Sequence, residues 1–126
     1  MCSVFTIHSN IGAAGEDIAA RYLESIGFEV LERNFRWRAG EIDIVARDGK
    51  TVVFVEVKAR RPGPFGAAVE QITASKRRRM VKTALAYMAS RGMTGVECRF
   101  DVVAVDLPRF GPPAVSLIKG AFDCGR

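Results

Sequence analysis

A short turn between two strand-like segments constrains the fold of this chain most strongly. Residues 41–47 and 51–59 are rich in valine and isoleucine, and Asp48-Gly49 lies between them. Both residue types accept the positive φ that a two-residue hairpin turn requires, so the dipeptide is a strong hairpin signal. The turn would pair Arg47 with Lys50 and would place the two strands side by side in antiparallel order.

Further segments extend this hairpin into an α/β fold. Periodicity and turn signals predict two helices, over 11–26 and 74–91, and three more strands, over 28–34, 100–107 and 115–118. Ser9 or Asn10 can cap the first helix and Gly27 can close it, while Thr73 can cap the second. The order α-β-β-β-α-β predicts a mixed central sheet flanked by helices.

The chain length agrees with one domain. The chain has 126 residues, about the common size of a single domain, and no internal repeat or interior linker interrupts it. We expect a core over about 11–107, followed by a C-terminal strand and tail over 108–126.

Acidic side chains gather on one face of the predicted hairpin. Because side chains alternate across a strand, Glu41 and Asp43 share one face of their strand, and Glu56 and Lys58 share one face of the next. The expected register places Asp43 opposite Phe54 and Glu41 opposite Glu56. Directly opposed Cβ atoms are about 5 Å apart, so the four charged side chains should converge.

Such a cluster has two interpretations. Like charges that face each other across a ladder destabilise it, and a divalent cation bound by Asp43, Glu56 and Glu41 would remove that conflict. Mg²⁺ or Mn²⁺ would bind substrate phosphate and help to form hydroxide, while Lys58 would position the water or neutralise charge on the phosphate. The alternative is a solvated polar face in which Lys58 neutralises one carboxylate.

The composition excludes several other kinds of site. His8 is the only histidine, which leaves no comfortable Ser-His-Asp triad, and the three cysteines are scattered, without zinc-ligand spacing. No apolar run approaches the roughly 20 residues that span a bilayer, and no secretory signal begins the chain. We therefore expect a cytoplasmic protein without a membrane partner.

Positive charge is concentrated at the start of the second predicted helix. The net charge is +5, and Lys76, Arg77, Arg78, Arg79 and Lys82 lie in this one region. A charge run is usually a solvated face, but cations near a helix N-terminus oppose the helix dipole, so phosphate contact explains them better.

Other cations and one aromatic residue could also contact nucleic acid. Arg60 follows the third strand and could guide a nucleic-acid strand. In Arg36-Trp37-Arg38, Trp37 could stack on a base, although we expect it in the core.

The sequence resembles a known family. Asp43 followed by Glu56-Val57-Lys58 resembles the PD-(D/E)XK restriction-endonuclease-like superfamily, with Ile42 in place of the proline. The strings GEDIAARYL, ERNFRWRAGEIDIVARD and FVEVKAR resemble the YraN-like family of bacterial proteins, over roughly Gly12 to Asp106.

The resemblance implies a three-layer nuclease fold and further site residues. Glu16 matches an extra carboxylate of the Holliday-junction-resolvase branch, and Lys76 matches a lysine of the site. A metal-dependent endonuclease that acts on DNA, including branched DNA, is expected. A nucleic-acid-binding module without cleavage is the alternative, and a homodimer stays open.

Overall fold

A computed structural model describes residues 11–38, 40–61 and 72–122 of the chain. Ser9, Asn10, His8 and most of the loop after Arg60 lie outside the described residues. The described elements, in chain order, are α2 (Ile11–Ser25), β1 (Glu29–Trp37), β2 (Gly40–Asp48), β3 (Thr51–Arg60), α3 (Ala74–Ser90), β4 (Cys98–Asp106) and β5 (Ala114–Phe122). This order confirms the predicted α-β-β-β-α-β succession and the fifth strand.

The five strands form one mixed sheet whose spatial order follows the chain, β1-β2-β3-β4-β5. Strands β1, β2 and β3 pair in antiparallel order, β3 and β4 are parallel, and β5 returns antiparallel to β4. A parallel pair needs a crossover connection, and the segment that contains α3 supplies it. Strand β3 is therefore the centre of the sheet.

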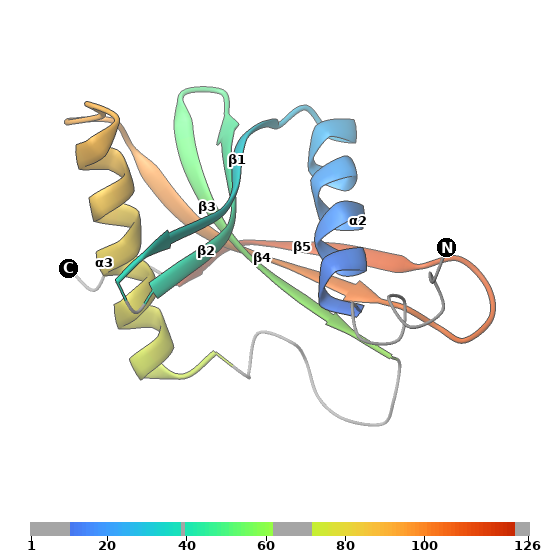
Figure 1. Cartoon of the computed structure of the whole chain (residues 1–126). Coiled ribbons are helices and arrows are strands. Elements are labelled where there is room, and N and C mark those ends of the chain that lie inside the picture. The colour runs from blue at the N-terminus through green and yellow to red at the C-terminus, as the bar shows by residue number, and fades with distance from the viewer. Residues whose placement is uncertain (1–10, 39, 62–71, 123–126) are drawn as a thin grey trace, which may run out of the picture.

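The two helices cover opposite faces of this sheet, so the fold has three layers (Figure 1). Each face has its own apolar core. The core under α2 contains Ala19, Ala20, Leu23, Phe28, Ile44, Ala46, Val53, Val55, Val103 and Val105. The core under α3 contains Ile42, Val45, Val52, Phe54, Met80, Ala84, Tyr87, Met88 and Phe100.

Local signals set the ends of the helices. The Thr73 hydroxyl accepts a hydrogen bond from the Lys76 amide at 3.1 Å, which confirms the predicted cap of α3. After α2 the chain turns at Gly27, whose φ is +99°, and the Phe28 amide donates to the Leu23 carbonyl at 2.9 Å. Ile26, which the helical periodicity places on the apolar face, lies beyond the last turn and is 44% exposed.

The register predicted for the hairpin was wrong by two residues. Asp48 pairs with Thr51, and Val45, rather than Asp43, lies opposite Phe54. The central turn residues are thus Gly49 and Lys50, and positive φ is confined to Gly49, at +62°. A type II′ turn has this pattern, with glycine first, whereas the predicted turn would need positive φ earlier. A shift of two residues keeps every side chain on its face.

Strict alternation breaks down in β2 before Asp43. Ile44 packs in the core under α2, but Ile42 packs in the core under α3, so these two side chains lie on opposite faces, whereas regular alternation would place them on one face. On the neighbouring strand, Asn34 has a φ of +56°, in the left-handed region. This departure from extended geometry explains why the alternation in the sequence did not reveal that β1 continues to Trp37.

Gly15 allows α2 to lie close to the central strand. A methyl group added at Gly15 would collide with the Cβ atom of Ala59 on β3, whereas one added at Gly12 would meet nothing within 4 Å. We expect Gly15→Ala to lower the free energy of unfolding by about 1–3 kcal/mol, the usual cost of overpacking, although alanine is the better helix former.

Gly12→Ala, in the same helix, should leave stability unchanged or slightly higher. Chemical denaturation of both variants measures the difference, and adding Ala59→Gly to Gly15→Ala should restore part of the loss. Equal stability of the two single variants would contradict the close approach.

Candidate carboxylate site

The site lies where β2 separates from β3. The paired residues of this ladder end at Ile44 and Val55, and the next residue of β2 is Asp43. The Val57 amide donates a hydrogen bond to Asp43 Oδ2 at 2.8 Å. A side-chain carboxylate therefore satisfies a backbone donor of the central strand, which holds the Asp43 side chain between the two strands.

Glu56 is a charged residue buried in the central strand. It is 5% exposed, and its Oε2 atom lies 2.5 Å from Lys76 Nζ and 3.8 Å from Lys58 Nζ. A buried carboxylate needs such partners because desolvation of an unpaired charge is costly. Lys76 comes from the first turn of α3, so this ion pair connects the helix to β3.

A small cavity of about 170 Å³ is lined by residues of β2, β3 and α3. Its lining contains three carboxylates, two cations and two other residues: Glu41, Asp43, Glu56, Lys76, Arg79, Gly40 and Met80. Gly40 permits the close approach of β2 to α3, because a methyl group there would collide with Thr83 Oγ1. The Thr83 hydroxyl itself donates to the Arg79 carbonyl at 2.8 Å.

Burial and like charge perturb the Asp43 carboxyl. Burial raises the pKa of Asp43 to about 7, and the neighbouring Glu56 carboxylate adds to the shift, while the Val57 amide opposes it. Glu16 and Glu41 raise the pKa of Asp43 further. The pKa of Glu16 is also raised, chiefly by burial, with Arg33 acting in the opposite direction. Four carboxyl groups thus interact around one point of the fold.

The structure brings some predicted site residues together and leaves others apart. Glu41, Asp43 and Glu56 share the cavity, and Lys58 lies beside Glu56. Glu16, on α2, interacts electrostatically with Asp43 without lining the cavity, and it lies 3.9 Å from Arg33.

The predicted basic residues fall into three groups. Lys76 and Arg79 line the cavity, and Arg79 also donates to the Ser75 hydroxyl at 2.9 Å. Arg78 is exposed on α3 and does not line the cavity. Arg60 lies at the end of β3 and forms an ion pair of 3.0 Å with Asp106.

Two features of the site were not predicted. Gly40 was not assigned a role, although a glycine directly before an acidic residue of a strand is a signal for a close backbone approach. Met80 lines the cavity from α3 and is buried, and an apolar residue in a predicted helix indicates only a place in the core.

The described part of the chain contains no group of three His, Cys, Asp or Glu side chains close enough to hold a metal ion between them. The carboxylates of the cavity nevertheless fit a hard cation in chemistry, because Mg²⁺ takes one or two carboxylates and fills its other positions with water and phosphate.

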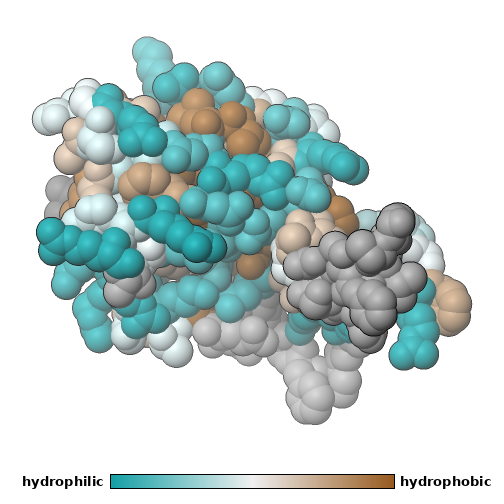
Figure 2. Space-filling view, in the orientation of Figure 1, coloured by the Kyte–Doolittle hydropathy of each residue, from teal (hydrophilic) through white to brown (hydrophobic). Residues whose placement is uncertain are grey.

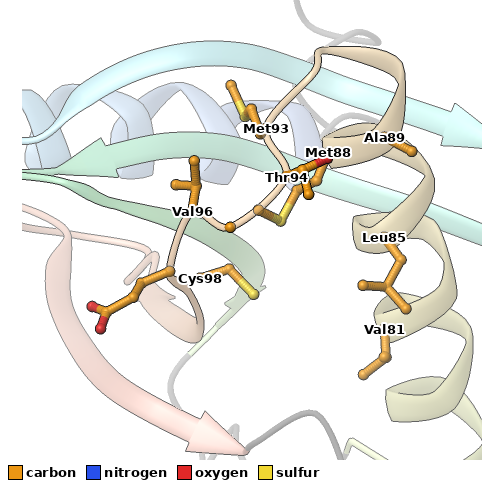
Figure 3. Close-up of a pocket in the computed structure, with 10 residues that line it drawn as sticks. Val81, Leu85, Met88, Ala89, Met93, Thr94, Val96 and Cys98 are labelled. Atoms are coloured by element: carbon orange, nitrogen blue, oxygen red, sulfur yellow. The ribbon is translucent and has the colours of Figure 1, made fainter.

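A larger hollow lies toward the other end of α3. It measures about 870 Å³, and Val81, Leu85 and Met88 line it together with residues 93–98 (Figure 3). Glu97 is the only charged residue in this lining. The two hollows share no residue, and the clustered carboxylates and their cations line the smaller one.

Hydrophilic side chains cover most of the molecular face seen in Figure 2, with hydrophobic ones in small groups. Neither of the two described helices is long and apolar enough to cross a membrane.

The fold and the site define a class: a three-layer α/β protein with a carboxylate–lysine cluster between its central strand and its second helix. Comparison with known proteins identifies the family. The pattern of the uncharacterised protein family UPF0102 matches residues 15–105. The chain belongs to this family, the YraN-like family that its motifs resemble.

Several relatives align over nearly their whole length. A UPF0102 protein of Geobacter sulfurreducens is 47% identical over 113 residues, which cover 90% of this chain and 88% of the relative. One of Moorella thermoacetica is 48% identical, covering 88% and 93%. One of Syntrophus aciditrophicus is 44% identical over 95% of each chain.

The perturbed Asp43 carboxyl predicts a pH-dependent stability. Its pKa is about 7 in the folded protein and about 4 in an unfolded chain, so the folded state binds the proton more tightly. This group therefore contributes stability that is full below about pH 4 and is lost as the pH rises through 7. Asp43→Asn keeps an acceptor for the Val57 amide and removes the charge.

In chelator, we expect Asp43→Asn to be more stable than wild type at pH 8, by on the order of 1 kcal/mol, with a smaller difference at pH 5. Urea denaturation at the two pH values measures this, with Glu24→Gln on the outer side of α2 as the control. A variant that is less stable at pH 8 would mean that an ionised Asp43 is held by favourable contacts instead.

Proposed function

We propose that this chain is a Mg²⁺- or Mn²⁺-dependent endonuclease that hydrolyses phosphodiester bonds in DNA, including branched DNA. One observation carries the proposal. Three carboxylates, Glu41, Asp43 and Glu56, line one cavity together with the cations Lys76 and Arg79. Carboxylates can hold a divalent cation, and cations beside them can receive the phosphate that the metal activates.

The residues divide into roles by their surroundings. Asp43 and Glu56 would hold the metal, and Glu41, on the same lining, would reach it through a bound water. The metal would polarise the phosphate and supply hydroxide. Lys58 would orient the attacking water or neutralise the developing phosphate charge, because its amine lies beside Glu56 at 3.8 Å. Glu16 would act on Asp43 electrostatically from α2.

Lys76 would have two roles, one without the metal and one with it. It neutralises Glu56 through Oε2, so a metal ion held by Glu56 would compete with the lysine for that carboxylate. The lysine that balances the charge without metal could then interact with substrate phosphate instead.

A second function has its own support. Glu56 has two lysine partners in the described structure, which is a satisfactory arrangement for a buried carboxylate without any metal. A nucleic-acid-binding module that keeps the fold but does not cleave would have the same pairing.

Cleavage and metal binding together distinguish the two. We expect wild-type protein with Mn²⁺ to cut at least one member of a panel of linear, single-stranded and branched DNAs, and chelator to abolish the cutting. Lys58→Ala should lose cleavage but retain much of the metal affinity measured by calorimetry, whereas Asp43→Ala and Glu56→Ala should lose both. Glu24→Gln should behave like wild type.

Tight binding of the panel without any cleavage by wild type would replace the enzyme with the binding module. Unchanged metal binding in both Asp43→Ala and Glu56→Ala would move the metal to another site.

The basic residues of α3 lead to a separate prediction about DNA binding. Because Lys76 pairs with Glu56, the exposed Arg78 and Arg79 test phosphate contact with less disturbance of the carboxylates. Replacing both with glutamine should weaken duplex binding at every sequence. The log–log salt slope should fall by up to about 0.9 for each lost phosphate contact.

Lys50→Gln, at the β2–β3 turn on the far end of these strands, is the matched control and should leave the slope unchanged. If the double arginine variant also keeps the wild-type slope, the arginines form only a solvated helix face.

A further inference from the structure

The end of the β1–β2 hairpin carries an aromatic side chain that the core does not use. Trp37 is the only tryptophan of the chain and the last residue of β1. Phe35, two residues earlier, packs against the core under α3 and meets the Tyr87 ring edge-on at 5.1 Å. Among the described residues, Trp37 belongs to neither core cluster and is half-buried. The expectation that Trp37 lies in the core was therefore wrong.

Trp37 lies beside the carboxylate cavity. Its partner across the β1–β2 ladder is Gly40, and the partner of Arg36 is Glu41, so two cavity-lining residues directly face this segment. Arg36 Nε lies 3.6 Å from Glu41 Oε2. Since Gly40 has no side chain, the strand opposite Trp37 offers it no side-chain partner at that position.

Arg38 completes the arrangement. Its guanidinium carbon lies 4.7 Å from the centroid of the Trp37 ring, so a cation covers part of the indole. Arg38 has a φ of +52°, in the left-handed region that is uncommon for residues other than glycine. The backbone thus holds a cation against an aromatic ring at the rim of a site suited to phosphate.

These groups match the requirements of an unpaired nucleotide. Aromatic rings and arginine planes stack on exposed bases, and flanking cations receive the phosphates. A base inside a continuous duplex is already stacked on its neighbours and cannot use such a platform without being flipped out. Arg36, Arg38 and Arg79 around Trp37 and the cavity favour a polyanion over an apolar protein partner.

We propose that Trp37, backed by Arg38, is a stacking platform for an unpaired base next to the carboxylate site. The substrate class is therefore DNA with single-stranded or unpaired nucleotides, such as a flap or a branch point, rather than continuous duplex. This inference rests on the proposed function for its reaction but makes a separate claim about binding.

The sole tryptophan provides a direct measurement. In chelator, so that nothing is cut, the protein is titrated with a dT oligomer of about 12 nucleotides, a length within the usual range for single-strand sites, and separately with a blunt hairpin duplex. We expect the dT oligomer to quench the Trp37 emission strongly and the duplex to quench it weakly.

Variants test the platform by the anisotropy of labelled DNA. Trp37→Ala should bind the dT oligomer roughly tenfold more weakly, while Trp37→Phe keeps most of the affinity, because a smaller ring still stacks. Duplex affinity and the salt slope should change little, since no phosphate contact is removed. Phe110→Ala is the control, since Phe110 is an exposed aromatic residue, 84% accessible, between β4 and β5. Thermal melts verify that each variant is folded.

Several results would overturn the proposal. They are no binding of the dT oligomer at low salt, unchanged tryptophan emission when that oligomer is bound, and an equal loss of dT and duplex affinity in Trp37→Ala.

A response to phosphatidylglycerol vesicles but not to DNA would assign the platform to a membrane surface. Quenching by wild-type protein that never cuts with Mn²⁺ would reject the nuclease and keep the platform. DNA cutting by wild-type protein without quenching of the Trp37 emission would reject the platform and keep the nuclease.

Discussion

The buried charge of Glu56 is the constraint on which the rest of the site depends. A carboxylate in the central strand of a sheet is stable only with close partners, and Lys76 provides one from α3 at 2.5 Å. This pair connects the first turn of α3 to the central strand. It also brings Arg79 and Met80 to the cavity, because both follow Lys76 by about one helical turn. The basic start of the helix and the acidic hairpin thus form one unit.

The two faces of the sheet differ in composition and in what they contribute to the site. Under α2 the packing is apolar and close, as the contact of Gly15 with Ala59 requires, and Glu16 lies at its edge. Under α3 the apolar core gives way to charged groups near Gly40, where β2 and β3 separate. The separation frees the Val57 amide, and Asp43 accepts its hydrogen bond. A site therefore forms where regular strand pairing ends.

Local signals in the sequence were sufficient for the elements. The Asp48-Gly49 turn, the Thr73 cap and the period of the helices predicted five strands and two helices in the correct order. The strand register could not be predicted from the sequence, because Asp48-Gly49 and Gly49-Lys50 are both acceptable turn dipeptides. The observed turn is Gly49-Lys50, with positive φ only at Gly49. The sequence also could not predict on which face of the sheet Ile42 lies, because side chains stop alternating where the backbone leaves extended geometry.

The sequence by itself determined that Asp43, Glu56 and Lys58 lie on adjacent strands, because alternation and a two-residue turn leave little freedom over such short distances. Only the tertiary structure decided which distant groups join them. Lys76 reaches Glu56, Gly40 lies against Thr83, and Trp37 stays outside the core because the position of α3 over the sheet determines these contacts. That position results from packing across the whole domain, which no local pattern of residues encodes.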